Sequence, residues 1–294
     1  MTRTVSLGPV LISAAVALGG MGLAVLVGSG ESTLAGLPTL TVLAALAFII
    51  QWAALVPAYV YQTEHYYDLT GSLTYLSLIA LAVLAGQQAE AGVRSILLAG
   101  LCGIWAARLG TFLFRRVKRA GKDGRFDAIK PDFGRFMLAW TLQGLWVFLT
   151  LLAALIGMTQ AGPGLDAFAL LGALVWLAGF AIEAVADAQK SAFTSNPGNR
   201  GRFINVGLWR WSRHPNYFGE IVLWVGIAII ATPVLQGAAW LGWISPLFVA
   251  FLLIKVSGIP LLEKRADEKW GGQAEYERYK AQTPVLILRP PGKT

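Results

Sequence analysis

The feature that most restricts the fold of this chain is a series of long apolar segments. We place them near residues 8–28, 36–60, 70–86, 93–114, 136–158, 166–186, 217–232 and 238–257. A helix needs roughly 20 apolar residues to cross the hydrocarbon core of a bilayer. The third and seventh segments are short, and the last two are compatible with one broken pair. The pattern therefore predicts an all-α, polytopic membrane protein with seven or eight transmembrane helices.

The composition agrees with a chain that is embedded in a membrane. Only 14% of the 294 residues are charged, whereas soluble domains carry about 25%. The first apolar segment follows Arg3 and resembles a secretory signal peptide. It is longer than the roughly 7–15 apolar residues of such a peptide, so we expect a retained helix. We expect a single membrane domain over residues 1–294.

The net charge of +8 is concentrated in a few loops. Basic residues crowd positions 115–135, 200–213 and 264–280, whereas the loops 28–36 and 87–92 contain no lysine or arginine. Loops rich in lysine and arginine stay on the cytoplasmic side of a membrane. We therefore expect the basic loops and the C-terminus to face the cytoplasm. Orientation by itself explains much of this charge.

The most informative polar segment is residues 209–220, which precedes the apolar residues 221–231. Hydrocarbon does not solvate such groups, so they need a polar partner. An anchor at the lipid headgroups would explain the first three residues, Trp-Arg-Trp. It does not explain Asn216 and Glu220, which share one face of the helix that Pro215 would begin. We therefore predict a site for a large anionic cofactor.

A second group of ionisable residues lies between two apolar segments. Glu64 and Asp68 are four residues apart and would share a helix face, with Tyr67 beside them. A carboxyl group in apolar surroundings has a raised pKa and stays protonated near neutral pH. It could then donate a hydrogen bond to a substrate carbonyl, as a general acid does, and Tyr67 could do the same. The alternative is a short polar turn at the membrane interface.

Further ionisable side chains lie inside the apolar segments themselves. Arg108 needs a partner there, either one of the two acids above or a cofactor phosphate. Glu183 and Asp187 share a face near the end of the sixth segment. They could bind ribose hydroxyls or pair with an arginine of the 200–213 loop. Solvation of the helix end explains these two acids nearly as well.

Several other kinds of site do not fit the sequence. Two histidines, His65 and His214, are too few for a multi-histidine metal site, and we expect no bound metal. Cys102 is the sole cysteine, so no internal disulfide can form. No glycine-rich phosphate loop is present. A ligand must be held by side chains of the membrane helices and their loops. Residues 261–282 predict an amphipathic helix, broken near residues 271–272, that lies on the membrane or caps a pocket.

The sequence motifs resemble a known family. Residues 212–220 (Ser-Arg-His-Pro-Asn-Tyr-Phe-Gly-Glu), Trp224 and residues 256–263 (Val-Ser-Gly-Ile-Pro-Leu-Leu-Glu) look like the steroid 5-alpha-reductase family, in particular its bacterial membrane branch. The resemblance covers roughly residues 60–290, which divides the chain into N-terminal helices, 1–60, and a reductase-like catalytic region, 61–294. The Arg-His-Pro-x-Tyr core also resembles isoprenylcysteine-type membrane methyltransferases, but the flanking residues favour the reductases.

The resemblance implies NADPH-dependent reduction of a carbon–carbon double bond conjugated to a ketone, in a seven-helix fold whose cytoplasmic loops cap the cofactor. The substrate would be an enone lipid, above all a 3-oxo-Δ4 steroid. We expect a monomer in a bacterial cytoplasmic membrane, in contact with lipid and without nucleic acid. The residues that would bind the cofactor are Asp187, Arg202, Arg213, His214, Asn216, Tyr217, Glu220, Arg119 and Arg108.

The resemblance leaves the proton donor open. Tyr67 and Asp68 stand where the animal enzymes have a Gln-Glu pair, whose acid is implicated at the substrate carbonyl. Trp105 replaces their catalytic tyrosine. We therefore expect Asp68, Tyr67 or Glu64 to donate, and Trp105 and Trp224 to contact the substrate. The main alternative is a methyltransferase that uses S-adenosylmethionine, and a third is a transporter or lipid-binding protein.

Overall fold

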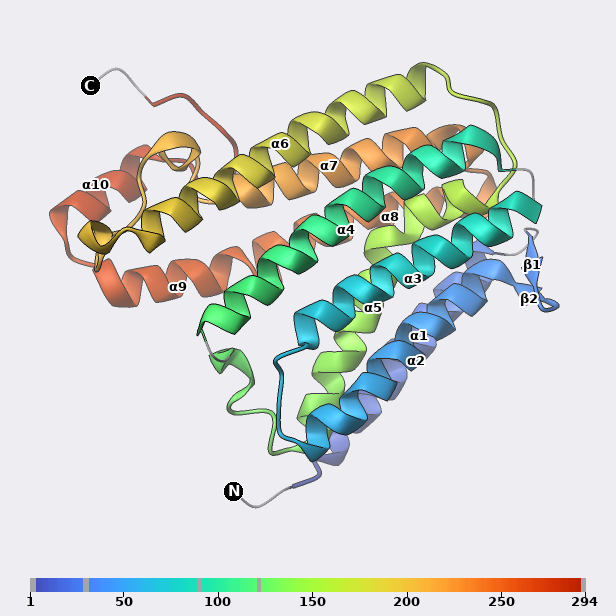
Figure 1. Cartoon of the computed structure of the whole chain (residues 1–294), viewed down its shortest axis with the longest axis horizontal. Helices are drawn as coiled ribbons and strands as arrows, with labels where there is room; N and C mark the ends of the chain where they lie inside the picture. Colours follow the sequence, from blue (N-terminus) through green and yellow to red (C-terminus); the bar gives the residue numbers. More distant parts are fainter. Residues whose placement is uncertain (1–3, 29–31, 89–90, 121–122, 292–294) are drawn as a thin grey trace. The chain divides into compact units, whose positions relative to one another are not determined.

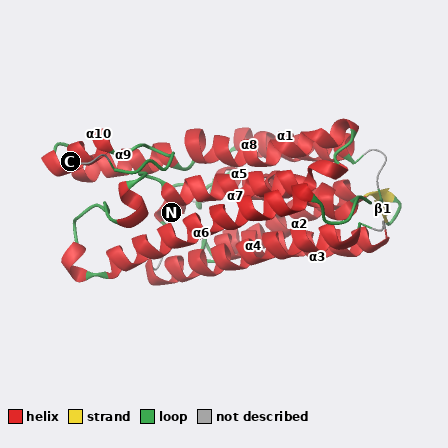
Figure 2. Ribbon diagram, turned by 90° about the horizontal axis from the view of Figure 1, so that it is seen from above, coloured by secondary structure: helices red, strands yellow, loops and turns green. Residues whose placement is uncertain are grey.

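The computed structural model describes residues 4–28, 32–88, 91–120 and 123–291, with the backbone alone for residues 116–120, and this part is almost entirely helical (Figure 1, Figure 2). Within it, eight segments are long and apolar enough to cross a membrane: Leu7–Val27, Thr39–Val60, Tyr67–Gln88, Gly92–Arg115, Phe133–Thr159, Ala167–Ser195, Pro215–Val234 and Gly237–Trp270. The protein is thus an all-α, multi-pass membrane protein. The predicted fold class is confirmed, and eight rather than seven segments are candidates to cross the membrane.

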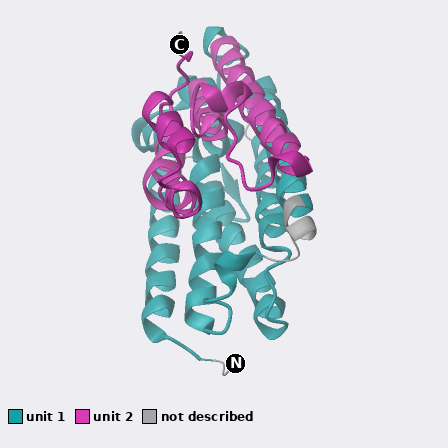
Figure 3. Cartoon of the chain, turned by 90° about the vertical axis from the view of Figure 1, so that its left-hand side faces the viewer, with its two compact units in different colours: residues 1–169, 230–245 teal, residues 170–229, 246–294 magenta. Residues whose placement is uncertain are grey.

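The chain divides into two compact units (Figure 3). Unit 1 comprises residues 1–169 and 230–245, and unit 2 comprises residues 170–229 and 246–294. The single membrane domain with a division after residue 60 stays a prediction. Unit 1 holds α1 (Leu7–Val27), α2 (Thr39–Val60), α3 (Tyr67–Gln88), α4 (Gly92–Ala120), α5 (Phe133–Thr159) and the 3₁₀ segments η1 (Gly124–Phe126) and η5 (Gly237–Trp243).

The helix α5 is the centre of unit 1. The helices α1, α2, α3 and α4 all pack against it. Every residue from 147 to 159 is buried, as expected for a helix that is apolar on all sides and needs neighbours all round. At its start, Asp132 accepts hydrogen bonds from Ser6 Oγ (2.6 Å), Arg135 N (2.9 Å) and Thr4 Oγ1 (2.9 Å). These bonds hold the pKa of Asp132 down to about 2, and they fasten the starts of α1 and α5 together.

A short hairpin joins α1 and α2. Its strands β1 (Thr33–Leu34) and β2 (Leu37–Pro38) are antiparallel. The two turn residues between them, Ala35 and Gly36, have φ angles of 53° and 78°. Two consecutive positive φ values are typical of the tight turns that match the twist of a hairpin.

In unit 2, α6 (Ala167–Ser195) and α7 (Pro215–Ala231) pack closely through glycines. A Cβ atom at Gly219 would lie 2.6 Å from Glu183 N, and one at Gly226 would lie 2.6 Å from Gly172 O. These glycines are two helical turns apart, and without side chains they let the two backbones touch, as is common between helices in membranes. The contacts fix the antiparallel register of α6 against α7.

The last apolar segment is not one regular α-helix. It consists of η5, α8 (Ile244–Phe251) and the π-helical turn η6 (Leu252–Val256). After Ser257 and Gly258 the chain continues as α9 (Ile259–Trp270) and, past a break at Gly271 and Gly272, as α10 (Ala274–Gln282). The remaining elements of the described residues are the short 3₁₀ segments η2 (Pro197–Asn199), η3 (Gly207–Arg210) and η4 (Thr232–Val234).

Candidate functional site

The register of α6 against α7 brings the predicted polar residues of unit 2 together. Glu183 faces Gly219, so Asp187, one turn further along α6, lies beside the start of α7. There Asn216 Nδ2 donates a hydrogen bond to Asp187 Oδ1 (3.3 Å). Glu183, Asp187 and Glu220 are all buried, with at most 7% of each residue exposed. Asp187, Asn216 and Glu220 are therefore held at one helix pair, as the sequence predicts.

The loop between α6 and α7 is covered by the C-terminal helices. Trp270 Nε1 donates to Gly201 O (2.6 Å), and Tyr279 Oη donates to Trp209 O (2.7 Å). Beyond α10 the chain returns along the same loop, where Arg213 N donates to Pro284 O (2.9 Å). Of the two alternatives for residues 261–282, the structure supports the one in which they cover a pocket.

A cavity of about 270 Å³ lies between this loop and the C-terminal helices. Four basic side chains line it: Lys190, Arg213, Arg265 and Lys269. Five aromatic side chains form most of the remaining wall: Phe203, Trp209, Trp270, Tyr276 and Tyr279. Among the described lining residues Glu263 is the one carboxylate. The wall therefore suits a ligand that carries both negative charge and a planar ring.

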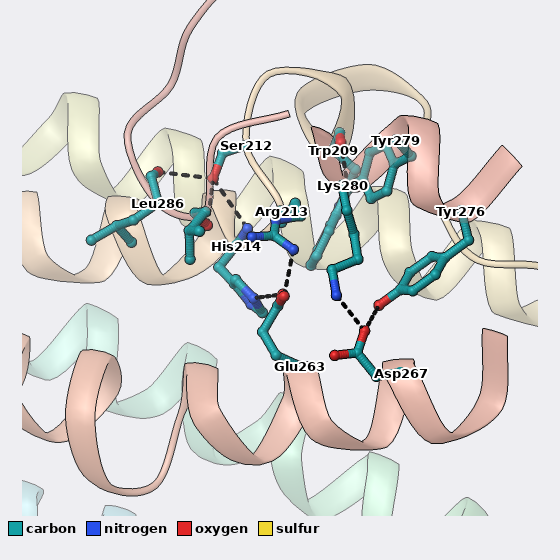
Figure 4. Close-up of polar contacts among 11 residues, drawn as sticks. Trp209, Ser212, Arg213, His214, Glu263, Asp267, Tyr276, Tyr279, Lys280 and Leu286 are labelled. Carbon is teal, nitrogen blue, oxygen red and sulfur yellow. Dashed lines mark hydrogen bonds and ion pairs between the residues drawn. The ribbon is translucent and has the colours of Figure 1, made fainter. Parts of the chain in front are cut away.

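Glu263 is already engaged with two cavity residues (Figure 4). Its Oε1 is 2.7 Å from His214 Nε2, and its Oε2 accepts a hydrogen bond from Arg213 Nη1 (2.5 Å). The His214 ring also stacks on Tyr217, with ring centroids 5.7 Å apart. This contact links the cavity to the first turn of α7.

Two buried polar atoms of Arg213 and His214 have no hydrogen-bond partner among the described residues. Burial lowers the pKa of His214 more than Glu263 raises it, so the imidazole is neutral near pH 7. A neutral ring that donates through Nε2 to Glu263 keeps Nδ1 as an acceptor. Both His214 Nδ1 and Arg213 Nε are buried without a hydrogen-bond partner in the described part of the chain. Buried polar atoms usually have a partner, and a water molecule or a polar group of a ligand would satisfy these two.

In unit 1, Glu64 does not behave as the sequence predicts. It is 2% exposed, accepts a hydrogen bond from Asp123 N (3.0 Å) and forms an ion pair with Lys130. Burial raises the pKa of Glu64, but the hydrogen bond from Lys130, that from Asp123 and the charge of Lys130 together lower it below its ordinary value. The expectation of a protonated Glu64 is therefore wrong, and its basic partner is Lys130 rather than Arg108.

Replacing Lys130 by methionine should show how much its ion pair with Glu64 contributes to stability. Glu64 would lose its counter-ion while still buried, which should lower the free energy of unfolding at pH 7 by about 1–3 kcal/mol. The lowered pKa means that the native pair stabilises the fold above the ordinary pKa of Glu64 and that this is lost in acid. The measurement is unfolding in detergent at several pH values. The double variant E64Q/K130M should recover much of the loss, and equal stability of K130M and native protein would contradict the assignment.

Tyr67 is engaged by α5. Its hydroxyl donates a hydrogen bond to Ala139 O (2.9 Å). Its ring packs against Phe126 and Trp140, with centroids 4.7 Å and 5.0 Å away. The hydroxyl proton is thus directed to a backbone carbonyl, which makes Tyr67 a structural contact in this conformation.

Asp68 lies in the first turn of α3 and is partly buried. Its charge reaches the loop before α5. Burial lowers the pKa of Arg125 there, but the hydrogen bond and charge of Asp123, with the charge of Asp68, raise it above its ordinary value. Glu64, Asp68 and this loop therefore belong to one polar cluster at the same end of unit 1.

The remaining predicted residues are scattered over both units. In unit 1, Trp105 is buried in α4 with its ring 5.2 Å from that of Tyr75, and Arg108 follows one turn later, partly buried. In unit 2, Trp224 is fully buried in α7, one turn after Glu220. Arg202 is exposed and does not line the cavity. The side chain of Arg119 lies outside the described residues.

Most of the residues that line the cavity were not predicted from the sequence. No role was predicted for Glu263, although this residue ends the quoted 256–263 motif, or for the basic residues Lys190, Arg265 and Lys269. The motif position of Glu263 was the one available signal. Nothing in the spacing shows that residues of α9 approach a loop some 50 positions earlier.

Eight apolar helical segments with buried polar clusters define a polytopic membrane protein, and unit 2 adds a basic, aromatic cavity. Residues 55–283 match the model of a family described as "Protein of unknown function (DUF1295)". The chain belongs to this family. No curated protein and no solved structure matches it significantly. The matched residues include the predicted polar residues of both units and the helices that cover the cavity.

Proposed function

We propose that this protein is an NADPH-dependent membrane reductase that acts on the conjugated carbon–carbon double bond of an enone lipid. A 3-oxo-Δ4 steroid is the expected substrate, from the resemblance to steroid 5-alpha-reductases. One observation carries the proposal: the residues assigned to the cofactor from sequence, Asp187, Asn216, Arg213 and His214, gather where α6 ends and α7 begins, beside a basic cavity.

The chemistry of these residues fits the cofactor. NADPH is a polyanion with two ring systems, and the cavity offers cations, aromatic faces and the unpaired atoms Arg213 Nε and His214 Nδ1. When bound, it would supply a hydride for the β carbon of the enone, with a proton added at the α carbon and NADP⁺ as the oxidised product. By the charge of its loops, the site would open to the cytoplasm.

The protein side of the reaction is binding, orientation and polarisation. Asn216, Tyr217 and Glu220 would hold the nicotinamide or its ribose. Asp187 would also contact the cofactor, and the buried α6–α7 interface would exclude water. Asp68 is the proposed donor to the substrate carbonyl and would have to be protonated when the substrate binds; Glu64 is held ionised by Lys130, and Tyr67 donates elsewhere. A donor there stabilises the negative charge that develops on the oxygen in the transition state.

The charge of the cavity argues against the methyltransferase alternative. S-adenosylmethionine carries a positive sulfonium and no phosphate. The four basic side chains of the cavity would repel that sulfonium, and Glu263 is already shared by Arg213 and His214. A cofactor with several phosphates matches the same wall by charge.

The test is turnover by the purified protein in lipid nanodiscs with NADPH and a panel of enones. We expect loss of the near-ultraviolet absorbance of NADPH together with formation of the saturated ketone. Glu220→Gln should weaken NADPH binding about tenfold or more, since hydrogen bonds to charged groups contribute about 1.5–3 kcal/mol. Glu268→Gln, an exposed acid paired with Lys264, is the matched control. Methyl transfer from S-adenosylmethionine, or no enone turnover, would overturn the proposal.

A further inference from the structure

The helices α9 and α10 form one side of the cavity in unit 2, and the proposed function does not yet say which part of the cofactor they contact. The volume of about 270 Å³ lies below the roughly 300–1,000 Å³ typical of pockets that enclose a whole drug-sized ligand. A complete dinucleotide is larger still. The cavity therefore suits one nucleotide-sized part of a larger ligand.

The aromatic wall of the cavity is continuous. Phe203 packs against Tyr276 and Tyr279, with ring centroids 5.3 Å apart in each pair, and against Trp270 at 6.1 Å. The phenol of Tyr276 is already engaged, because it donates to Asp267 Oδ1 (2.8 Å). Ring faces without their polar ends are a suitable surface on which a planar base can stack.

Two cations of α9 stand out by their lack of acidic partners. Arg265 and Lys269 are four residues apart, share one face of the helix and both line the cavity. Neither forms an ion pair among the described residues, whereas Lys264 on the same helix is paired with Glu268. Lys269 Nζ lies 4.6 Å from the Trp270 ring centroid, so it is held beside an aromatic face of the wall. Two adjacent cations without acids suit a doubly charged phosphate.

We infer that this cavity binds the 2′-phosphorylated adenosine half of NADPH, with adenine against the Phe203 wall and the 2′-phosphate at Arg265 and Lys269. These two residues would then select NADPH over NADH. The inference rests on the proposed function, since it takes the cofactor to be a nicotinamide dinucleotide. It adds which part of the cofactor the cavity recognises and which helix recognises the 2′-phosphate.

The test uses fragments of the cofactor, so that it does not depend on turnover. Binding of 2′,5′-ADP and of 5′-AMP to the full chain in nanodiscs is measured by calorimetry. The native protein should prefer 2′,5′-ADP by about tenfold or more, as expected for one charge-assisted contact. Lys269→Ala and Arg265→Ala should each remove most of this preference and leave 5′-AMP binding unchanged. Lys264→Ala, from the same helix, should keep it.

Two results would overturn the inference. One is equal affinity of the native protein for 2′,5′-ADP and 5′-AMP, and the other is an equal loss of preference in Lys264→Ala and Lys269→Ala. Enone turnover with NADPH and with NADH, measured on the same samples, distinguishes a failure of this inference from a failure of the proposed function. A native protein that reduces enones but shows no preference for the 2′-phosphate contradicts the inference alone. One that prefers 2′,5′-ADP without enone turnover supports the cavity assignment and contradicts the reductase.

Discussion

Replacing Asp68 by alanine is expected to lower enone turnover about a thousandfold while leaving NADPH affinity within about twofold of the native value. Proton donation by a positioned side chain contributes roughly 10²–10⁴-fold to a rate, and a lost hydrogen bond at a developing oxyanion has a similar effect. Asp68 is proposed to contact the substrate carbonyl and is not assigned to the cofactor, so its removal should spare NADPH binding.

Asp68 is proposed as the donor because its neighbours Glu64 and Tyr67 already interact with other groups. Glu64 is held ionised by Lys130, and the Tyr67 proton is directed at Ala139 O. The measurements are kcat with a saturating enone and the NADPH dissociation constant. Asp127→Ala, an acid on the loop before α5 that lies 3.6 Å from Lys130, is the control and should keep its activity. Native turnover in Asp68→Ala would remove this residue from the proposed mechanism, and a matching loss of NADPH binding would reassign it to the cofactor.

The membrane helices could be predicted from the sequence because their cause is local. A bilayer demands a minimum length of apolar chain, and each segment meets that demand by itself. The break at Gly271–Gly272 is likewise local, since two consecutive glycines favour a turn. The position of Asn216 and Glu220 on one face of α7 follows from helical spacing alone.

The candidate site could be predicted only in part, because its remaining features depend on register and on distant partners. The bond between Asn216 and Asp187 requires the glycine contacts that set α6 against α7. We expected burial to raise the pKa of Glu64, and burial does act in that direction. The opposite outcome comes from Lys130, which is 66 residues away and has no spacing signal.

Replacing Arg94 by alanine should have the largest effect on stability. Arg94 is 1% exposed and donates from Nη1 to Ile230 O (2.5 Å), from Nη2 to Gly164 O (2.8 Å) and from Nε to Pro163 O (3.4 Å). It also forms an ion pair with Asp166 Oδ2 at 3.0 Å. One side chain thus ties three backbone carbonyls and a carboxylate of unit 1 to the start of α4.

Breaking a buried ion pair from one side costs about 3–5 kcal/mol, because the other partners lose their hydrogen bonds and stay buried. We expect Arg94→Ala to lower the free energy of unfolding in detergent by that amount. Arg94→Lys should recover only part of it, since an ammonium cannot reproduce the planar set of guanidinium donors that reaches several carbonyls at once. Arg278→Ala, an exposed arginine of α10, is the control and should leave the free energy of unfolding unchanged. A loss below about 1 kcal/mol in Arg94→Ala would mean that water replaces the guanidinium, which requires that this end of unit 1 is open to solvent.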